Sequence, residues 1–260
     1  VTEAGFAADL GAEKFMDIKC RLNGIAPDAA VIVVTARALK MHGGVAKADL
    51  SAENVAALEK GFANVRVHIE NMAKFGVRTV LAVNRFVTDS EAELAKVKEL
   101  AASAGSAAVL CEGWGKGGAG AEELARKVAE IADEANEFKP VYPLDMPLKD
   151  KIETLAKEIY RAGSVEFDGK AVKKLRSYEE AGYGNLPVCM AKTQNSISHD
   201  KALLGAPSGY AFPVRDVQLY SGAGFVVAFA GDIMDMPGLP KAPSALNIDV
   251  DDEGVITGLF

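Results

Sequence analysis

The chain has 260 residues, with 29 Lys and Arg against 36 Asp and Glu, so its net charge is −7. Hydrophobic residues make up 49% and charged residues 25%. These proportions are typical of a globular protein and exclude a disordered tail or a fibrous repeat. The acidic balance also argues against a general nucleic-acid binder, because neutralising phosphates requires a basic face.

Cysteine spacing and the length of apolar runs indicate the cellular location of the chain. Cys20, Cys111 and Cys189 form no CxxC pair and no zinc-finger spacing, which favours a reducing, cytoplasmic location. The longest apolar runs, 29–34 and 225–230, are far shorter than the roughly 20 residues that span a bilayer, so no membrane partner is expected. The chain starts at Val1 rather than Met, and we expect that a preceding segment has been removed.

The first half alternates strand and helix patterns, which predicts an α/β fold with a mostly parallel sheet. Short β-branched apolar runs indicate buried strands, and Ser90 with Glu93 has the spacing of a capping box. The predicted elements are a strand at 30–35, helices at 51–60 and 64–75, a strand at 77–83, a helix at 90–104, a strand at 107–111 and a helix at 121–136.

The second half begins after a proline-rich stretch, 140–147, which is typical of a linker. Apolar residues at helical spacing then predict two helices, and β-branched runs predict three strands. These are helices at 148–162 and 170–181, strands at 187–191, 214–219 and 225–229, and a terminal hairpin at 247–260 that turns at 252–254.

Ligands of open α/β sheets bind beyond the carboxyl ends of the strands, so the residues after each strand are the first candidates. The first strand is followed by Arg37, Lys40 and His42, which we take as a polar floor of the site. Phe86 follows the second strand and Trp114 the third. Two aromatic residues at adjacent strand ends predict a slot for a flat ring.

Each of these aromatic residues also has a structural interpretation. Trp114 lies among glycines, outside any apolar period, so we favour ligand stacking over core packing. Phe86 alone is equally compatible with a hydrophobic loop anchor. For the histidines, His68 is predicted to lie mid-helix as a surface or a packing residue, and His199 to lie in a solvated turn.

The sequence gives little evidence for a phosphate-binding motif. The glycine-rich run 115–120 opens a helix and is compatible with anion binding, but equally with a flexible turn. The chain's two Gly-Lys pairs, Gly115-Lys116 and Gly169-Lys170, are not followed by Ser or Thr, so neither is a Walker-type loop.

Several motifs together resemble those of the formate–tetrahydrofolate ligase family, and the resemblance covers the whole chain. They are 1–15 with 17–21, 37–44, 186–194, 213–217, 222–225, 231–234, 236–241 and 256–260. Val87, Asn195 and His199 depart from the residues that are commoner in the family.

The resemblance implies ATP-dependent ligation of formate to tetrahydrofolate through formyl phosphate, giving 10-formyltetrahydrofolate. It also implies Mg²⁺, a monovalent cation (K⁺ or NH₄⁺) and a homotetramer. By the same resemblance, Phe6, Phe86, Leu110 and Trp114 match the residues that hold the folate ring.

The family's phosphate loop lies in an N-terminal half that has no counterpart here, so the nucleotide contacts are unknown. We therefore expect this chain alone to be inactive and the remaining N-terminal half to be its partner, because phosphoryl transfer depends on groups that position and neutralise the phosphates. The alternative is a catalytically silent folate-binding or oligomerisation module.

The family also suggests a division into three domains. These are 1–88, the end of a large P-loop-type domain; 89–140, a second α/β domain with the folate-stacking loop; and 141–260, a further α/β region. Because strands of the first domain would lack neighbours, we expect it to be less stable than the rest.

Overall fold

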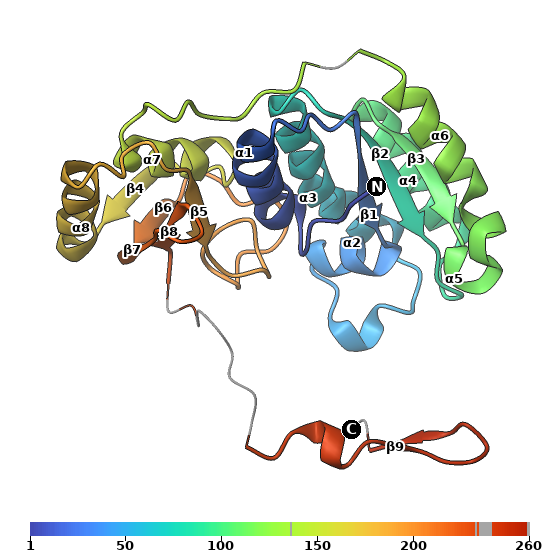
Figure 1. Ribbon diagram of the computed structural model, residues 1–260. Coiled ribbons are helices and arrows are strands. Elements are labelled where there is room, and N and C mark those ends of the chain that lie inside the picture. The colour runs from blue at the N-terminus through green and yellow to red at the C-terminus, as the bar shows by residue number, and fades with distance from the viewer. Residues whose placement is uncertain (136, 232, 234–240, 259–260) are drawn as a thin grey trace.

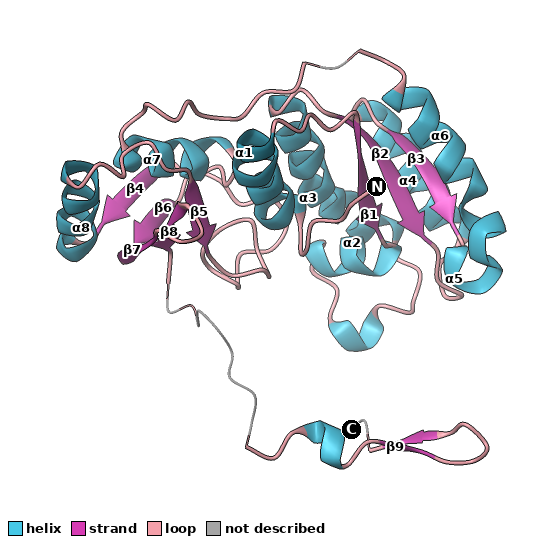
Figure 2. Cartoon of the chain, in the orientation of Figure 1, coloured by secondary structure: helices cyan, strands magenta, loops and turns pink. Residues whose placement is uncertain are grey.

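The computed structural model describes residues 1–135, 137–231, 233 and 241–258 (Figure 1). Strands and helices alternate, which confirms the predicted α/β class. Figure 2 shows the longer strands in two groups, with helices between them and around them.

The first group is a sheet of β1 (Ala29–Val34), β2 (Arg78–Asn84) and β3 (Ala107–Cys111). Both of its pairings are parallel, as predicted, and its strand order is β1-β2-β3. All three carboxyl ends therefore lie at one edge, beside α2 and α5 (Figure 1).

Helices cover both faces of this sheet, and alternate residues of β2 explain why. Leu81 and Val83 pack against α2, α3 and α4, whereas Val80 packs with Val109 against Ile131 of α6. The helices are α2 (Ala36–His42), α3 (Val55–Lys74), α4 (Glu91–Ser103), α5 (Gly113–Lys116) and α6 (Glu122–Ala132), with short 3₁₀ turns at Lys47–Asp49 and Gly117–Ala121.

The predicted capping box is confirmed. The Ser90 hydroxyl accepts from the Glu93 N–H, and the Glu93 carboxylate accepts from the Ser90 N–H, each at 3.2 Å. These two bonds satisfy backbone donors that a helix start otherwise leaves free.

The prediction of two helices at 51–60 and 64–75 is wrong, because α3 is one continuous helix. It starts at Asn54, whose side chain accepts from the Ala57 N–H at 2.9 Å. Gly61 does not interrupt the helix. It lies where α2 and α3 touch, and a Cβ there would collide with the Leu39 carbonyl oxygen.

No helix was predicted for the segment after β1, which forms the helix α2. Thr35 caps it by accepting from the Ala38 N–H at 3.1 Å. Gly43 ends α2 close to α3, where a Cβ would collide with the Ala57 carbonyl oxygen. Trp114 likewise lies in a short helix, α5, rather than in a loop.

The N-terminal segment winds into wide π-helical turns at Ala8–Ala12 and Phe15–Cys20 and ends in α1 (Arg21–Asn23). Gly24, with φ of 62°, terminates it in the left-handed conformation that glycine adopts without strain. Met16 of this segment is part of the core of the second half.

The second half has two small sheets. β4 (Ser164–Phe167) pairs with β6 (Ala211–Val214) in parallel, and β8 (Phe225–Phe229) lies between β5 (Val188–Ala191) and β7 (Asp216–Tyr220). α7 (Leu148–Glu158) and α8 (Gly169–Glu180) complete the packing.

Two strand predictions need correction here. The predicted strand 214–219 is two strands, β6 and β7, because the chain changes sheets at Arg215, whose N–H bonds to the Phe229 carbonyl at 2.9 Å. β4 was not predicted, since it is short and lies between two helices.

The linker 140–147 contains no helix or strand, as predicted, but it is not loose. Tyr142 is buried and its hydroxyl accepts from the Val188 N–H at 2.9 Å.

The terminal hairpin is confirmed as β9 (Asp249–Val250) paired antiparallel with β10 (Ile256–Thr257), after a 3₁₀ turn at Ser244–Leu246. The last two residues of the predicted hairpin, and most of the motif 236–241, lie outside the described residues.

The three-domain division stays a prediction. β2 and β3, on either side of its first boundary, are hydrogen-bonded neighbours in one sheet.

Candidate functional site

We call three side chains that follow the carboxyl ends of β1, β2 and β3 the aromatic platform: Arg37, Phe86 and Trp114. The Phe86 ring is 40% exposed and the Trp114 side chain 98% exposed. The Arg37 guanidinium lies 5.9 Å from the centre of the Phe86 ring, within the range of a cation–π contact. The platform therefore offers flat apolar faces beyond two adjacent strands.

Phe86 has a fixed backbone and an exposed ring. Its N–H donates to Asp89 Oδ2 at 2.8 Å, and its carbonyl accepts from the Asp89 N–H at 3.0 Å. The preceding Arg85 N–H bonds to the Cys111 carbonyl at 3.1 Å and extends the pairing of β2 with β3. The turn thus orients a ring that the core does not cover.

Glu112 connects the start of α5 to the exit of β2. Its carboxylate pairs with Lys116 at 2.6 Å and with Arg85 at 3.8 Å. The hydrogen bond from Lys116 lowers the pKa of Glu112. The Glu112 N–H also bonds to the Gly120 carbonyl at 2.9 Å, and a Cβ at Gly120 would collide with the Glu112 carbonyl. The glycine-rich run is therefore a compact turn that presents Trp114.

The other two predicted folate residues have different settings. Leu110 is part of β3 and packs partly against the core of the first sheet. Phe6 lies in the N-terminal segment, is 80% exposed and has φ of 61°, a left-handed conformation rare for a non-glycine residue. The role of the four residues in binding folate stays a prediction.

The three predicted floor residues do not share one surface. Arg37 joins the aromatic platform, and His42 lines a cavity described below. Lys40 is fully buried, pairs with Glu93 Oε1 at 2.9 Å and donates to the Ala52 carbonyl at 2.9 Å. Burial raises the pKa of Glu93, but hydrogen bonds from the Asn54 N–H, Lys40 and the Ser90 N–H lower it more, so the net direction is downward.

A polar cavity of about 510 Å³ lies between α2, α3 and the loop after β5. Asp9, His42 and His68 line it. The His42 Nδ1 atom accepts from the Gly205 N–H at 3.1 Å. Burial lowers the pKa of both histidines, and for His68 the nearby Asp9 opposes this.

Lys192 is buried and contacts two residues that line this cavity. Its amine pairs with Asp9 Oδ2 at 2.6 Å and donates to the Ser196 carbonyl at 2.6 Å. Desolvation is the main cause that lowers the pKa of Lys192, and Asp9 opposes it.

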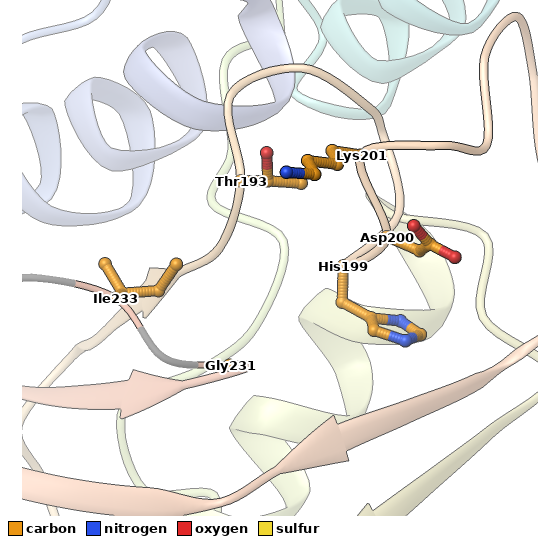
Figure 3. Close-up of a pocket in the computed structure, with 6 residues that line it drawn as sticks. All are labelled: Thr193, His199, Asp200, Lys201, Gly231 and Ile233. Atoms are coloured by element: carbon orange, nitrogen blue, oxygen red, sulfur yellow. The ribbon is translucent and has the colours of Figure 1, made fainter.

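A smaller, open cavity of about 320 Å³ is formed partly by the same loop (Figure 3). Thr193, Asp200 and Lys201 come from the loop, and His199 packs its ring 5.7 Å from Tyr210 and 5.9 Å from Phe212. His199 was predicted to be solvated, but these rings cover part of it. His68 lies mid-helix in α3, as predicted, and of the two alternatives, surface or packing, it is the buried one.

The sequence reasoning missed the buried carboxylates of the N-terminal segment: Asp9, Glu13 and Asp17. Burial, with the neighbouring Glu13, raises the pKa of Asp17 to about 8. The four-residue spacing of these three acids places them on one helical face, which was the available signal.

Neither a metal site nor a membrane span emerges from the described ranges. They contain no cluster of three or more His, Cys, Asp or Glu placed to hold a metal ion. None of the helices described is long and apolar enough to cross a bilayer.

A parallel α/β sheet with exposed aromatic residues beyond its strand ends is typical of α/β proteins that bind flat ligands. The family model "Formate--tetrahydrofolate ligase" matches residues 1–260, so the chain belongs to the formate–tetrahydrofolate ligase family.

Curated relatives with that name agree with this assignment. The chain is 59% identical over 261 residues to the proteins from Zymomonas mobilis and Maricaulis maris, and 57% identical over 260 residues to that from Paracoccus denitrificans. Each match covers 100% of this chain and 47% of the relative. The chain therefore spans about half the length of the curated relatives it matches.

Proposed function

We propose that this chain carries the tetrahydrofolate-binding part of a formate–tetrahydrofolate ligase. The observation that supports this best is the aromatic platform, in a chain that belongs to this family. Phe86 and Trp114 present flat faces beyond adjacent strands, and a pteridine ring is a flat heterocycle suited to stacking on them.

In this proposal, Phe86 and Trp114 stack on the ring, Arg37 supports Phe86 from its other side, and Leu110 and Phe6 add apolar contact. Stacking orients the ring with little loss of side-chain freedom, because aromatic side chains have few rotatable bonds. The chain's part in the reaction is to bind and orient the nitrogen that receives the formyl group.

The whole reaction proceeds, in our proposal, by ATP-dependent formation of formyl phosphate, followed by attack of the folate nitrogen on the formyl carbon with loss of phosphate and of the nitrogen's proton. Mg²⁺ and a monovalent cation would neutralise phosphate charge when bound. The residues that hold them, and the nucleotide, would come from the N-terminal half of the enzyme.

The open edge of β1 is the surface we propose for that half. Val31 and Val33 of β1 are exposed, and among the described residues β1 pairs with β2 alone. An exposed strand edge is a template for further pairing. A cytoplasmic homotetramer, as the family suggests, completes the proposal.

Titration with tetrahydrofolate, followed by Trp114 fluorescence, tests the binding role, because Trp114 is the single tryptophan. We expect quenching or a blue shift that saturates. Phe86→Ala should weaken binding about tenfold, since stacking of one flat ring contributes roughly 1–3 kcal/mol. Val87→Ala, a fully exposed neighbour, is the matched control and should leave affinity unchanged. No fluorescence change with the wild-type chain would refute the platform.

A catalytically silent module remains the second candidate, because the chain matches 47% of its relatives' length. Purified chain, checked by intact mass, should make no formyltetrahydrofolate from formate and MgATP. Activity restored by adding a separately expressed N-terminal half of a relative would favour the enzyme over the silent module.

A further inference from the structure

The polar cavity between α2, α3 and the loop after β5 has no part in the proposed stacking of folate. Four distant segments line it: 7–9, 41–47, 64–68 and 194–204. Its volume of about 510 Å³ lies within the range of roughly 300–1,000 Å³ that is usual for small-molecule sites.

The inner end of the cavity contains a buried polar group without a partner. His68 is 6% exposed, and no described residue forms a hydrogen bond with its Nδ1 atom. That atom lies 4.0 Å from Asp9 Oδ1, too far for a direct bond. Leaving a buried nitrogen unpaired is unfavourable, so a ligand group between the two side chains would be stabilised.

The inner end of the cavity, at Asp9 and His68, is unfavourable for a cation. Asp9 is 2% exposed, and its second oxygen already pairs with Lys192. The net charge of that pair is zero. A hydroxyl fits better, because it can donate to Asp9 Oδ1 and also bond to His68.

The exposed part of the cavity lining carries two ammonium groups. Lys47 and Lys201 line it and are exposed, and neither forms an ion pair with a carboxylate in the described part of the chain. Lys201 also borders the smaller cavity, where its side chain reaches toward Thr193 (Figure 3). Two such ammonium groups complement the two negative charges of a phosphate monoester.

We propose that this cavity binds a small organic phosphate that carries a hydroxyl. The phosphate lies between Lys47 and Lys201, and the hydroxyl bridges Asp9 and His68. The cavity is much larger than inorganic phosphate requires, so it has room for an organic part of the ligand between the phosphate and the hydroxyl. This site is separate from the aromatic platform, so it stands or falls independently of the proposed function.

Glycerol 3-phosphate is the probe, and calorimetric titration of the 260-residue chain is the measurement. Inorganic phosphate and glycerol are titrated separately, because the first carries only the phosphate group and the second only hydroxyl groups. We expect glycerol 3-phosphate to bind at least about tenfold more tightly than either, with affinity that falls as salt is raised.

Variants separate the two ends. Lys47→Gln with Lys201→Gln should weaken binding at least about tenfold and remove most of the salt dependence. Lys98→Gln, at an exposed position on α4, is the matched control and should change neither. His68→Leu should reduce affinity for glycerol 3-phosphate but not for inorganic phosphate. It should also fold, because it replaces an unpaired buried nitrogen with an apolar group.

Three results would overturn the proposal: no binding of glycerol 3-phosphate at millimolar concentration, equal affinity for glycerol 3-phosphate and inorganic phosphate, or binding that the lysine variants leave unchanged. Fluorescence titration with tetrahydrofolate reads a different site, so failure of one proposal is distinguishable from failure of the other.

Discussion

Lys40→Met tests whether this lysine stabilises the fold or serves a binding surface. Both side chains of the Lys40–Glu93 pair are fully buried, 2.9 Å apart. Removing one partner leaves an uncompensated buried charge, which costs about 3–5 kcal/mol. With a urea slope of about 2 kcal/mol per M, the unfolding midpoint should fall by roughly 2 M.

The double variant Lys40→Met with Glu93→Gln provides the internal control. The introduced glutamine can still accept a capping bond but carries no charge, so the double variant should recover about 2 kcal/mol or more relative to K40M. Lys60→Met, at an exposed position of α3, should be neutral. A K40M midpoint within about 0.5 M of wild type would refute the reasoning. Loss of tetrahydrofolate binding in the folded double variant would instead favour the floor role.

Two further predictions concern stability. Asp17→Asn should change its pH dependence: the pKa of Asp17 is raised from 3.8 to about 8, so the folded state keeps a proton that the unfolded state releases. The free energy of unfolding of the wild type should therefore fall relative to that of D17N as pH rises from about 4 to about 8, and then level off. Urea midpoints measured across that pH range test this. Parallel pH profiles of the two midpoints would contradict it. Gly61→Ala should destabilise the chain by about 1–3 kcal/mol, since its Cβ would collide with the Leu39 carbonyl. Gly118→Ala meets no atom within 4 Å and should leave the thermal midpoint nearly unchanged.

Local signals were enough to predict most of the first half. The capping box at Ser90, the β-branched run at 29–34 and the short apolar run at 107–111 are local sequence patterns that predict their elements. The parallel direction of the strands was predicted from the alternation of strand and helix. The exposed aromatic residues at the strand exits were predicted for the same reason, since their position depends on where the strands end.

Tertiary contacts decided the rest. Local sequence alone predicts a helix break near Gly61. In the structure, its lack of a side chain allows α2 and α3 to touch. Lys40 reads as a polar residue at a strand exit, but the helix that Thr35 caps turns it toward Glu93, which lies far along the chain on α4. The polar cavity combines segments from both halves of the chain, and no local pattern indicates that they meet.

Hydrogen exchange can test the expectation that residues 1–88 are the less stable part, and the structure sharpens it. Met16 is part of the core of the second half, and Asp17 Oδ1 accepts from the Val141 N–H at 2.9 Å. Exchange reports local opening, so amides of the segment 8–20 should be protected together with α7. In the described part of the chain β1 pairs with β2 alone, so the outward amides of β1 should exchange fastest among the strands of the first sheet. Equal protection of those amides and the interior of α3 would contradict the proposal that β1 has an open edge where a further strand can pair.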